Sequence, residues 1–128
     1  MDISQQKEFV ASGWEIGAHS LSHMDLTQIE DKESFNEIIQ SKTNLEEKLN
    51  TNIISFAYPF GKLSESVKNN VKISGYKYAL ATDSGGSMIE DDVFQIFRVN
   101  IFPQDGIMQL LKKTSPFYRR YYRFKRKK

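Results

Sequence analysis

Two histidines placed four residues apart, His19 and His23, are the side chains of this sequence best suited to binding a metal ion. That spacing puts both imidazoles on one side of the chain, whether the backbone is helical or extended. The sequence contains no cysteine, so a metal would have to bind through His, Asp or Glu. Two imidazoles supply part of a zinc site, which takes three protein ligands and an open position for water. The spacing alone leaves two interpretations open: a metal-binding pair, and two solvated loop histidines.

Two further groups of residues lie where strands are expected to end. The turn Tyr58-Pro59-Phe60-Gly61 stops the apolar run 53–58, and Asp83 follows the expected strand 78–82. In parallel α/β folds, the loops at the C-terminal ends of strands build the functional site. Each group also has a simpler interpretation, because Pro and Gly end strands and an Asp before Ser and Gly caps a turn. Asp83 is therefore a candidate for contact with a metal or substrate, and also for a purely local role.

The elements that would position these residues alternate between helix and strand four times. Helices are expected over 4–11, 31–49, from Ser64 to Gly75 and from Asp105 onward, and strands over 14–18, 53–58, 78–82 and 97–101. Ser4, Ser64 and Asp105 are the expected caps of the first, third and last helix. The short connections predict right-handed β-α units on a parallel sheet of about four strands. Four units are too few to close an eight-fold barrel of about 250 residues. We therefore expect an α/β fold whose barrel is incomplete or distorted.

The length of 128 residues predicts one folded domain, which we place at residues 1–114, followed by a tail at 115–128. Hydrophobic residues make up 39% and charged residues 27%, a balance that excludes a disordered or collagen-like chain. No apolar run approaches the roughly 18 residues of a membrane-spanning helix. The first residues lack a cationic region followed by an apolar stretch. As written, the sequence thus predicts a cytoplasmic chain without a secretory signal and leaves its final location open.

The C-terminal segment 112–128 differs in charge from everything before it. It holds nine of the eighteen Lys and Arg residues and no acid, while the rest of the chain has nine cations and sixteen acids. A nucleic-acid-binding domain normally spreads its cations over the folded surface, so no nucleic-acid partner is expected. Within the tail, Tyr118, Tyr121 and Tyr122 share one helix face. Three interpretations stay open: an aromatic face docked on the body, contact with an anionic membrane surface, and stacking on single-stranded nucleic acid.

The sequence around the two histidines resembles a motif of a known enzyme family. Residues 13–23 read Gly-Trp-Glu-Ile-Gly-Ala-His-Ser-Leu-Ser-His. This is similar to the second motif, Gly-x-Glu-Ile-x-x-His-Ser/Thr-x-x-His, of the polysaccharide deacetylases, which are the NodB-homology or carbohydrate esterase family 4 domains. Residues 56–61, Phe-Ala-Tyr-Pro-Phe-Gly, resemble the third motif of that family. Segments 75–79 and 97–99 follow in the family's order, so the resemblance runs from about residue 4 to residue 111.

The resemblance implies a (β/α) barrel of the NodB-homology type and hydrolysis of the acetamide C–N bond of acetylated sugars in a polysaccharide, such as a cell-envelope polymer. It implies a divalent metal, usually zinc, with His19 and His23 as two of its ligands. It also implies that the backbone N–H of Phe60, in the turn with Tyr58 and Pro59, donates to the oxyanion. The Tyr58 ring is in addition a candidate for stacking on a sugar, whereas we expect Trp14 in the core.

The sequence departs from the family pattern at three places. The first motif, Thr-Phe-Asp-Asp, which supplies the carboxylate base and an aspartate ligand, is absent, and so is the late Leu-x-His motif with its general acid. Ala57 stands where many members have an arginine. We therefore expect this chain to be the C-terminal part of such a domain, without a third metal ligand and without appreciable activity alone. The alternative is a non-catalytic carbohydrate-binding or assembly module that lacks the base.

An open parallel sheet also predicts assembly. The strand expected over 53–58 is apolar on both faces and needs a neighbour on each side. We expect a homodimer that covers the open edge, with the aromatic tail as the alternative cover.

Overall fold

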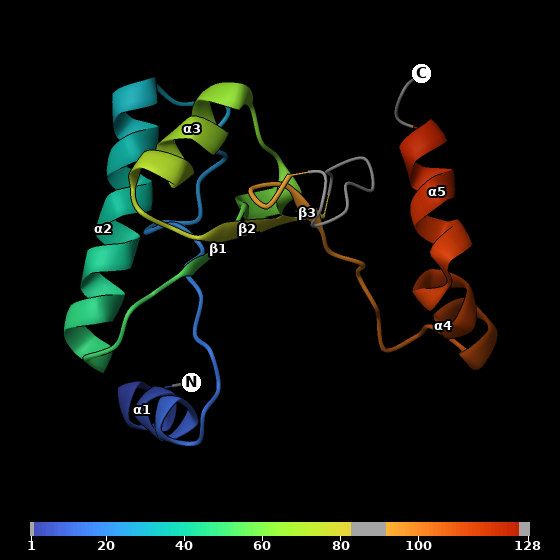
Figure 1. The fold of residues 1–128 in the computed structure, drawn as a ribbon, viewed down its shortest axis with the longest axis horizontal. Coiled ribbons are helices and arrows are strands. Elements are labelled where there is room, and N and C mark those ends of the chain that lie inside the picture. The colour runs from blue at the N-terminus through green and yellow to red at the C-terminus, as the bar shows by residue number, and fades with distance from the viewer. Residues whose placement is uncertain (1, 83–91, 126–128) are drawn as a thin grey trace.

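The chain is described by a computed structural model that covers residues 2–82 and 92–125 (Figure 1). The elements follow in the order α1 (Ile3–Ala11), α2 (Asp31–Leu49), β1 (Ser55–Ala57), the 3-10 turn η1 (Pro59–Gly61), α3 (Glu65–Ile73), β2 (Tyr78–Ala81), β3 (Ile96–Phe97), α4 (Ile107–Thr114) and α5 (Pro116–Lys125). None of the helices in these two stretches is long and apolar enough to cross a membrane.

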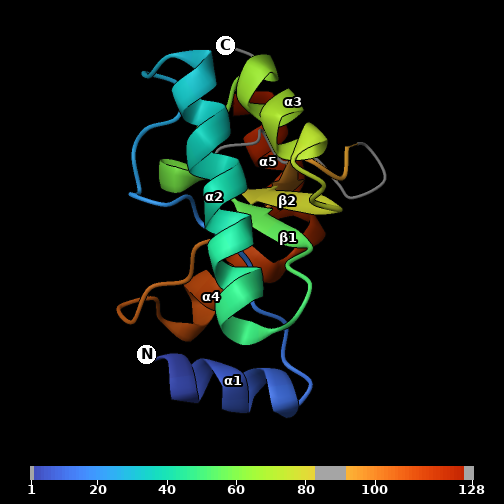
Figure 2. The same cartoon turned by 90° about the vertical axis from the view of Figure 1, so that its left-hand side faces the viewer.

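The strands form one parallel sheet in the order β1-β2-β3, and helices α2 and α3 cover one of its faces (Figure 1, Figure 2). Phe56 of β1 is in register with Ala79 of β2, and Ala81 with Phe97 of β3. All four side chains are buried, because alternate residues of a strand point to the same face and this face meets the helices. The predicted parallel α/β arrangement is confirmed over these three strands.

Helix α2 forms over the range that its apolar spacing predicts. It begins at Asp31 and ends at Leu49, and Asn50 stops it in the left-handed conformation with a φ of 51°. Ile38 and Leu49 are buried in the same core as Phe56 of the sheet. The amphipathic pattern and the C-terminal Asn are thus sufficient to place this helix.

The segment before His19 forms less strand than its sequence predicts. Over 14–18 only Ala18 pairs, in a parallel bridge to Phe56 built from two hydrogen bonds of 2.9 and 2.8 Å with Ser55 and Ala57. In the part of the chain that the structure describes, this segment has β1 beside it and no strand on its other side. The expected four strands are therefore three strands and one bridge, and the described residues do not form a full barrel.

Two predicted helix caps are wrong. Asp2, not Ser4, caps α1, because its carboxylate accepts a hydrogen bond from Gln5 N–H at 2.9 Å and the Gln5 side chain completes a capping box. Asp105 does not cap α4. Its carboxylate instead forms an ion pair with Lys113 inside that helix, which ties α4 to the segment before it.

Trp14 was expected in the core, and this expectation is wrong. Its side chain is 66% exposed and packs edge to face against Phe9 of α1, with ring centroids 5.9 Å apart. The segment that carries Trp14 pairs with the sheet only at Ala18, so the start of the segment has no sheet to pack against.

Candidate active site

His19 and His23 lie side by side where the segment paired with β1 ends. Their ring centroids are 4.8 Å apart, the ring planes are inclined by 70°, and both residues are exposed. Ser20 and His23 have positive φ values of 61° and 58°, so the chain turns back between the two imidazoles. The structure thus brings the rings together along a path that is neither helix nor strand.

The orientation of His19 is set by a hydrogen bond to β1. Its Nδ1 lies 2.7 Å from the carbonyl oxygen of Ala57. A carbonyl oxygen only accepts, so Nδ1 carries a proton, and in the neutral ring Nε2 then keeps its lone pair. Histidines that bind metals commonly donate their other N–H to a carbonyl or carboxylate in this way. His19 is therefore arranged to offer Nε2 as a ligand.

A buried carboxylate of α2 holds the loop that carries the histidines, and the sequence interpretation missed it. Glu37, 8% exposed, accepts hydrogen bonds from the backbone N–H groups of Leu21 and Ser22 at 3.1 and 2.8 Å, and from the Ser22 hydroxyl at 2.8 Å. The sequence feature that could have indicated Glu37 is its position next to Ile38, which puts a carboxylate on the apolar side of an amphipathic helix. A charge there is costly unless it is paired or hydrogen-bonded, which predicts specific partners.

Replacing Glu37 with alanine is expected to lower the free energy of unfolding by about 2 kcal/mol, because three donors lose a charged acceptor. Urea unfolding measures the effect, and the histidine ring signals in NMR spectra should shift because the loop moves. The control is Glu47→Ala, which removes an exposed carboxylate from the same helix and should change stability by less than about 0.5 kcal/mol. Equal effects of the two substitutions would contradict the role of Glu37.

The turn after β1 lies against the histidines. The Phe60 ring meets the His23 ring edge to face, with centroids 4.8 Å apart. Phe60 has a φ of 57°, in the left-handed region, and the hydrogen bonds that close the turn use the N–H groups of Gly61 and Lys62, at 2.9 and 3.2 Å. The N–H of Phe60 does not take part in those bonds, so this N–H remains a candidate donor to a bound group.

Tyr58 and Pro59 belong to the core rather than to a substrate surface. Tyr58 is 1% exposed, and its hydroxyl donates to the Phe94 carbonyl at 2.8 Å. Burial raises the pKa of the Tyr58 phenol, with a smaller contribution from nearby carboxylates, so the group stays protonated and keeps this bond. A buried ring cannot stack on a sugar, and that expectation for Tyr58 is wrong. The two residues instead fix the position from which the turn starts.

The described residues contain the two candidate ligands, His19 and His23, and no third candidate grouped with them. Asp83 lies outside the described residues, so its expected place at the site stays a prediction. Among the residues that the structure does describe, no three His, Asp or Glu side chains are grouped closely enough to hold a metal ion. Asp25, two residues after His23, forms an ion pair with Lys62 at 2.6 Å. That partner, together with Thr27, holds the pKa of the Asp25 carboxyl below its usual range.

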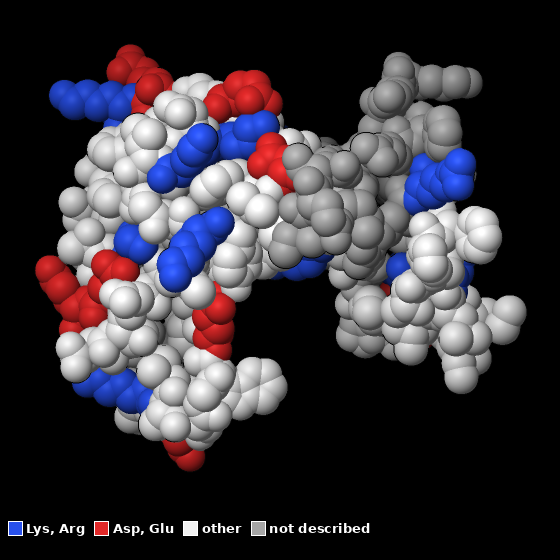
Figure 3. All heavy atoms as spheres, in the orientation of Figure 1, with Lys and Arg blue, Asp and Glu red and all other residues white. Residues whose placement is uncertain are grey.

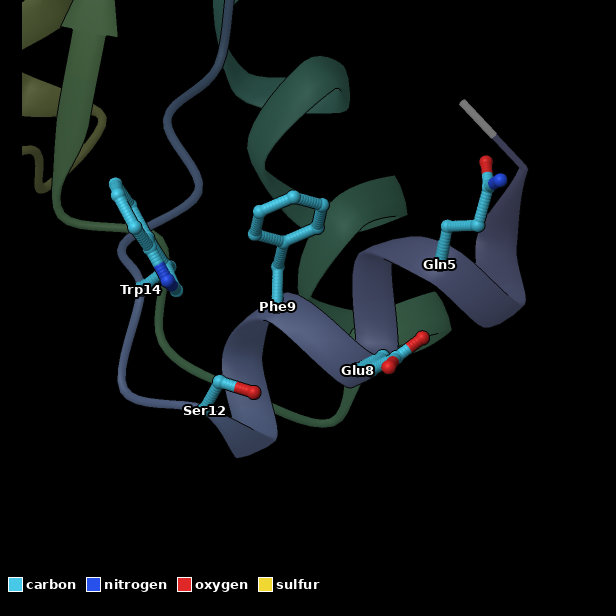
Figure 4. Close-up of a pocket in the computed structure, with 5 residues that line it drawn as sticks. All are labelled: Gln5, Glu8, Phe9, Ser12 and Trp14. Atoms are coloured by element: carbon cyan, nitrogen blue, oxygen red, sulfur yellow. The ribbon is translucent and has the colours of Figure 1, made fainter.

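A separate hollow lies beside α1 and does not include the histidines. Its volume is about 580 Å³, and it is lined by Gln5, Glu8, Phe9, Ser12 and Trp14 (Figure 4). The hollow combines two aromatic rings with an amide, a carboxylate and a hydroxyl, all of them groups that bind sugars by stacking or hydrogen bonding.

Comparison with known proteins adds independent findings. The family model described as polysaccharide deacetylase matches residues 3–79. The structure is similar to the Streptococcus pyogenes deacetylase PplD, solved in complex with acetate, with a TM-score of 0.80 and 27% identity over 91% of this chain and 51% of that one. It is also similar to BC0361, a polysaccharide deacetylase from Bacillus cereus, with a TM-score of 0.75 and 27% identity over 90% of this chain and 37% of that one.

A comparison of sequences alone also finds a relative described as a polysaccharide deacetylase. YxkH of Bacillus subtilis (strain 168) is 22% identical over 99 residues, which cover 77% of this chain and 36% of that protein. The chain therefore spans about half or less of the length of the relatives that it matches.

Proposed function

The chain belongs to the polysaccharide deacetylase family, and from this premise we propose that it takes part in metal-dependent hydrolysis of the acetamide C–N bond of acetylated sugars in a polysaccharide. The observation that carries the proposal is the histidine pair. The two imidazoles are 4.8 Å apart, and the Ala57 carbonyl holds the proton of His19 on Nδ1 so that Nε2 remains available.

The residues present fit a divalent metal ion, and zinc is our proposal because imidazole suits it well. His19 and His23 would hold the ion. A bound ion of this kind polarises the acetyl carbonyl and lowers the pKa of a coordinated water. The Ala57 carbonyl keeps the His19 tautomer fixed, and Glu37 holds the loop between the two histidines. Both imidazoles are exposed, which leaves an approach for a sugar chain.

The backbone N–H of Phe60 is our proposal for the oxyanion donor. A donor that is rigidly placed where negative charge develops stabilises the transition state more than the ground state. The Phe60 ring contacts His23, which places this turn beside the proposed ligands. Pro59 is buried on one side of Phe60 and Gly61 on the other, so the turn is held at both ends.

The carboxylate base, the general acid and the third ligand have no assigned residue in this chain. The sequence contains no Thr-Phe-Asp-Asp motif and no third histidine. We propose that the chain acts as the C-terminal part of a deacetylase domain, with the missing groups supplied by further sequence or by a second chain. The homodimer expected from the open sheet is a proposal of the same kind, and Asp83 is a further candidate for contact with the substrate.

A non-catalytic carbohydrate-binding module is the alternative, and the hollow beside α1 favours it. Trp14 is exposed there next to Phe9, with Gln5 and Glu8 within the same hollow (Figure 4). Exposed aromatic rings beside hydrogen-bonding groups suit a sugar ring, whose faces are apolar and whose edges carry hydroxyls. Under this alternative, sugar binding would persist without acetate release.

Acetate release from N-acetylated chito-oligosaccharides in the presence of zinc tests the proposed activity. We expect no appreciable release by this chain alone, because a base and an acid each contribute about 10²–10⁴-fold. Supplying a Thr-Phe-Asp-Asp segment, from the reading frame upstream of Met1 or as a separate chain, would add the base and the third ligand but not the general acid. It should therefore restore part of the release, and His23→Ala should abolish it again. Restored release that persists in the His23→Ala variant would contradict the role of the histidine pair.

A further inference from the structure

Helices α4 and α5 leave an apolar surface uncovered. The two helices pack on each other and stand to one side of the sheet and its covering helices (Figure 1). Five large apolar or aromatic side chains on them are between 56% and 79% exposed: Ile107, Met108, Leu111, Phe117 and Tyr121. On α4, the positions of Ile107, Leu110 and Leu111 follow helical spacing, so these residues form a continuous stripe. We call the exposed side chains of α4 and α5 the C-terminal surface.

The same segment carries one sign of charge. From Gly106 to the end of the chain there are nine Lys and Arg residues and no acid. Lys112 and Arg120 are exposed, whereas Lys113 is engaged with Asp105 and is not part of the surface. In Figure 3, acidic side chains are spread over the part built by α1 to α3, and the coloured side chains seen on α4 and α5 are mainly basic.

From this combination we propose that the C-terminal surface binds the surface of an anionic lipid bilayer. Helices of this kind lie in the plane of the interface, with the apolar face in the headgroup region and the cations near lipid phosphates. The apolar side chains and the cations together point to an anionic bilayer. Aliphatic side chains are stabilised by contact with hydrocarbon, and cations are stabilised by a dense negative surface. Such binding would hold the rest of the chain against a membrane, where an envelope polysaccharide is accessible.

Three other occupants fit the surface less well. Single-stranded nucleic acid would use the cations and the aromatic rings, but bases stack on rings and not on Ile107, Met108 or Leu111. A second copy would bring like charges together, among them Lys112 and Arg120 of each copy, which electrostatic repulsion opposes. Docking on the acidic body would bury Phe117, which is instead the most exposed of these side chains at 79%.

Co-sedimentation of the full 128-residue chain with lipid vesicles tests the proposal. We expect binding to vesicles of phosphatidylcholine mixed with phosphatidylglycerol, much weaker binding to phosphatidylcholine alone, and a decrease as salt is raised. The double variant Lys112→Glu/Arg120→Glu should partition at least about 25-fold less, since each cation near an anionic surface contributes about fivefold and the added carboxylates are repelled. The double variant Ile107→Ser/Leu111→Ser should show a decrease in vesicle binding at least as large.

Two matched controls separate this surface from general effects of charge and hydrophobicity. Lys32→Glu reverses an exposed cation on α2, and Ile73→Ser removes an exposed apolar side chain on α3, 61% exposed against 60% for Leu111. Both controls should bind vesicles within twofold of the unmodified chain, and circular dichroism checks that all variants fold.

Equal binding to neutral and anionic vesicles, or equal losses in the controls, would overturn the proposal. So would two results that point to the other occupants. One is preferential binding of a single-stranded oligonucleotide over anionic vesicles. The other is a dimer in analytical ultracentrifugation that dissociates in the Ile107→Ser/Leu111→Ser variant, with no vesicle binding by the unmodified chain.

Discussion

Replacing Gly61 with alanine is expected to lower the free energy of unfolding by about 3 kcal/mol, a large share of the stability of a small domain. Gly61 has a φ of 69°, and a Cβ built there would lie 1.8 Å from Thr82 Oγ1 and 2.8 Å from the Thr82 backbone nitrogen. The hydroxyl can rotate away, but the backbone of Thr82 follows β2 directly and cannot. Overpacking costs roughly 1–3 kcal/mol, and the left-handed conformation adds about 1 kcal/mol for a residue with a side chain.

Gly75→Ala is the matched control for this prediction. Gly75 has a φ of 80°, yet nothing lies within 4 Å of a Cβ built on it. Its substitution therefore reports the cost of the backbone conformation alone, about 1 kcal/mol. Urea unfolding of both variants separates the steric cost of the added Cβ from the cost of the left-handed backbone conformation. If Gly61→Ala is no more destabilising than Gly75→Ala, the turn after β1 is not held against β2 as described.

Helices were the part of the fold most open to prediction, because the pattern that defines them is local. The apolar spacing of α2 and its terminal Asn50 lie within one segment, and both bounds are confirmed. Caps were less predictable, since Asp2 and Ser4 are both good capping residues and only geometry decides between them. The role of Asp105 was not predictable from its local sequence either, because its partner Lys113 lies eight residues away in α4.

Strands were predicted less well, because a strand exists only through its neighbours. The run Ile53–Tyr58 is flanked by partners and becomes β1, although only over Ser55–Ala57. The segment 14–18 has equally suitable residues but pairs at Ala18 alone. Trp14 is exposed for the same reason, and sequence alone does not reveal which neighbours a strand will have.

The site was predictable where spacing is enough and not where contacts run between distant segments. His19 and His23 were expected on one side, and the structure places their rings 4.8 Å apart. The hydrogen bond from His19 to Ala57 joins residues 38 positions apart, and that from Ser22 to Glu37 joins residues 15 apart. Neither bond has a local signature, so the residues that orient the histidines became visible only in the structure.

Removing either histidine is expected to weaken zinc binding by about 100-fold or more, because each is one of the two proposed protein ligands. The chain itself should bind zinc weakly, since a catalytic site normally has three protein ligands. His19→Ala and His23→Ala should have similar effects if the two imidazoles hold one ion together. Lys32→Glu, an exposed substitution on α2, serves as a control that leaves the pair intact.

The most direct test of the histidine pair is a zinc titration followed by nitrogen-15 NMR of the imidazole rings. The chain has two histidines, so the ring signals can be assigned with the two alanine variants. We predict that the Nε2 signals of His19 and His23 shift together with one dissociation constant, and that His19 keeps its proton on Nδ1, where the Ala57 carbonyl lies 2.7 Å away. A response of one histidine only, loss of the Nδ1 proton of His19, or unchanged affinity of His23 in the His19→Ala variant would contradict a shared metal site.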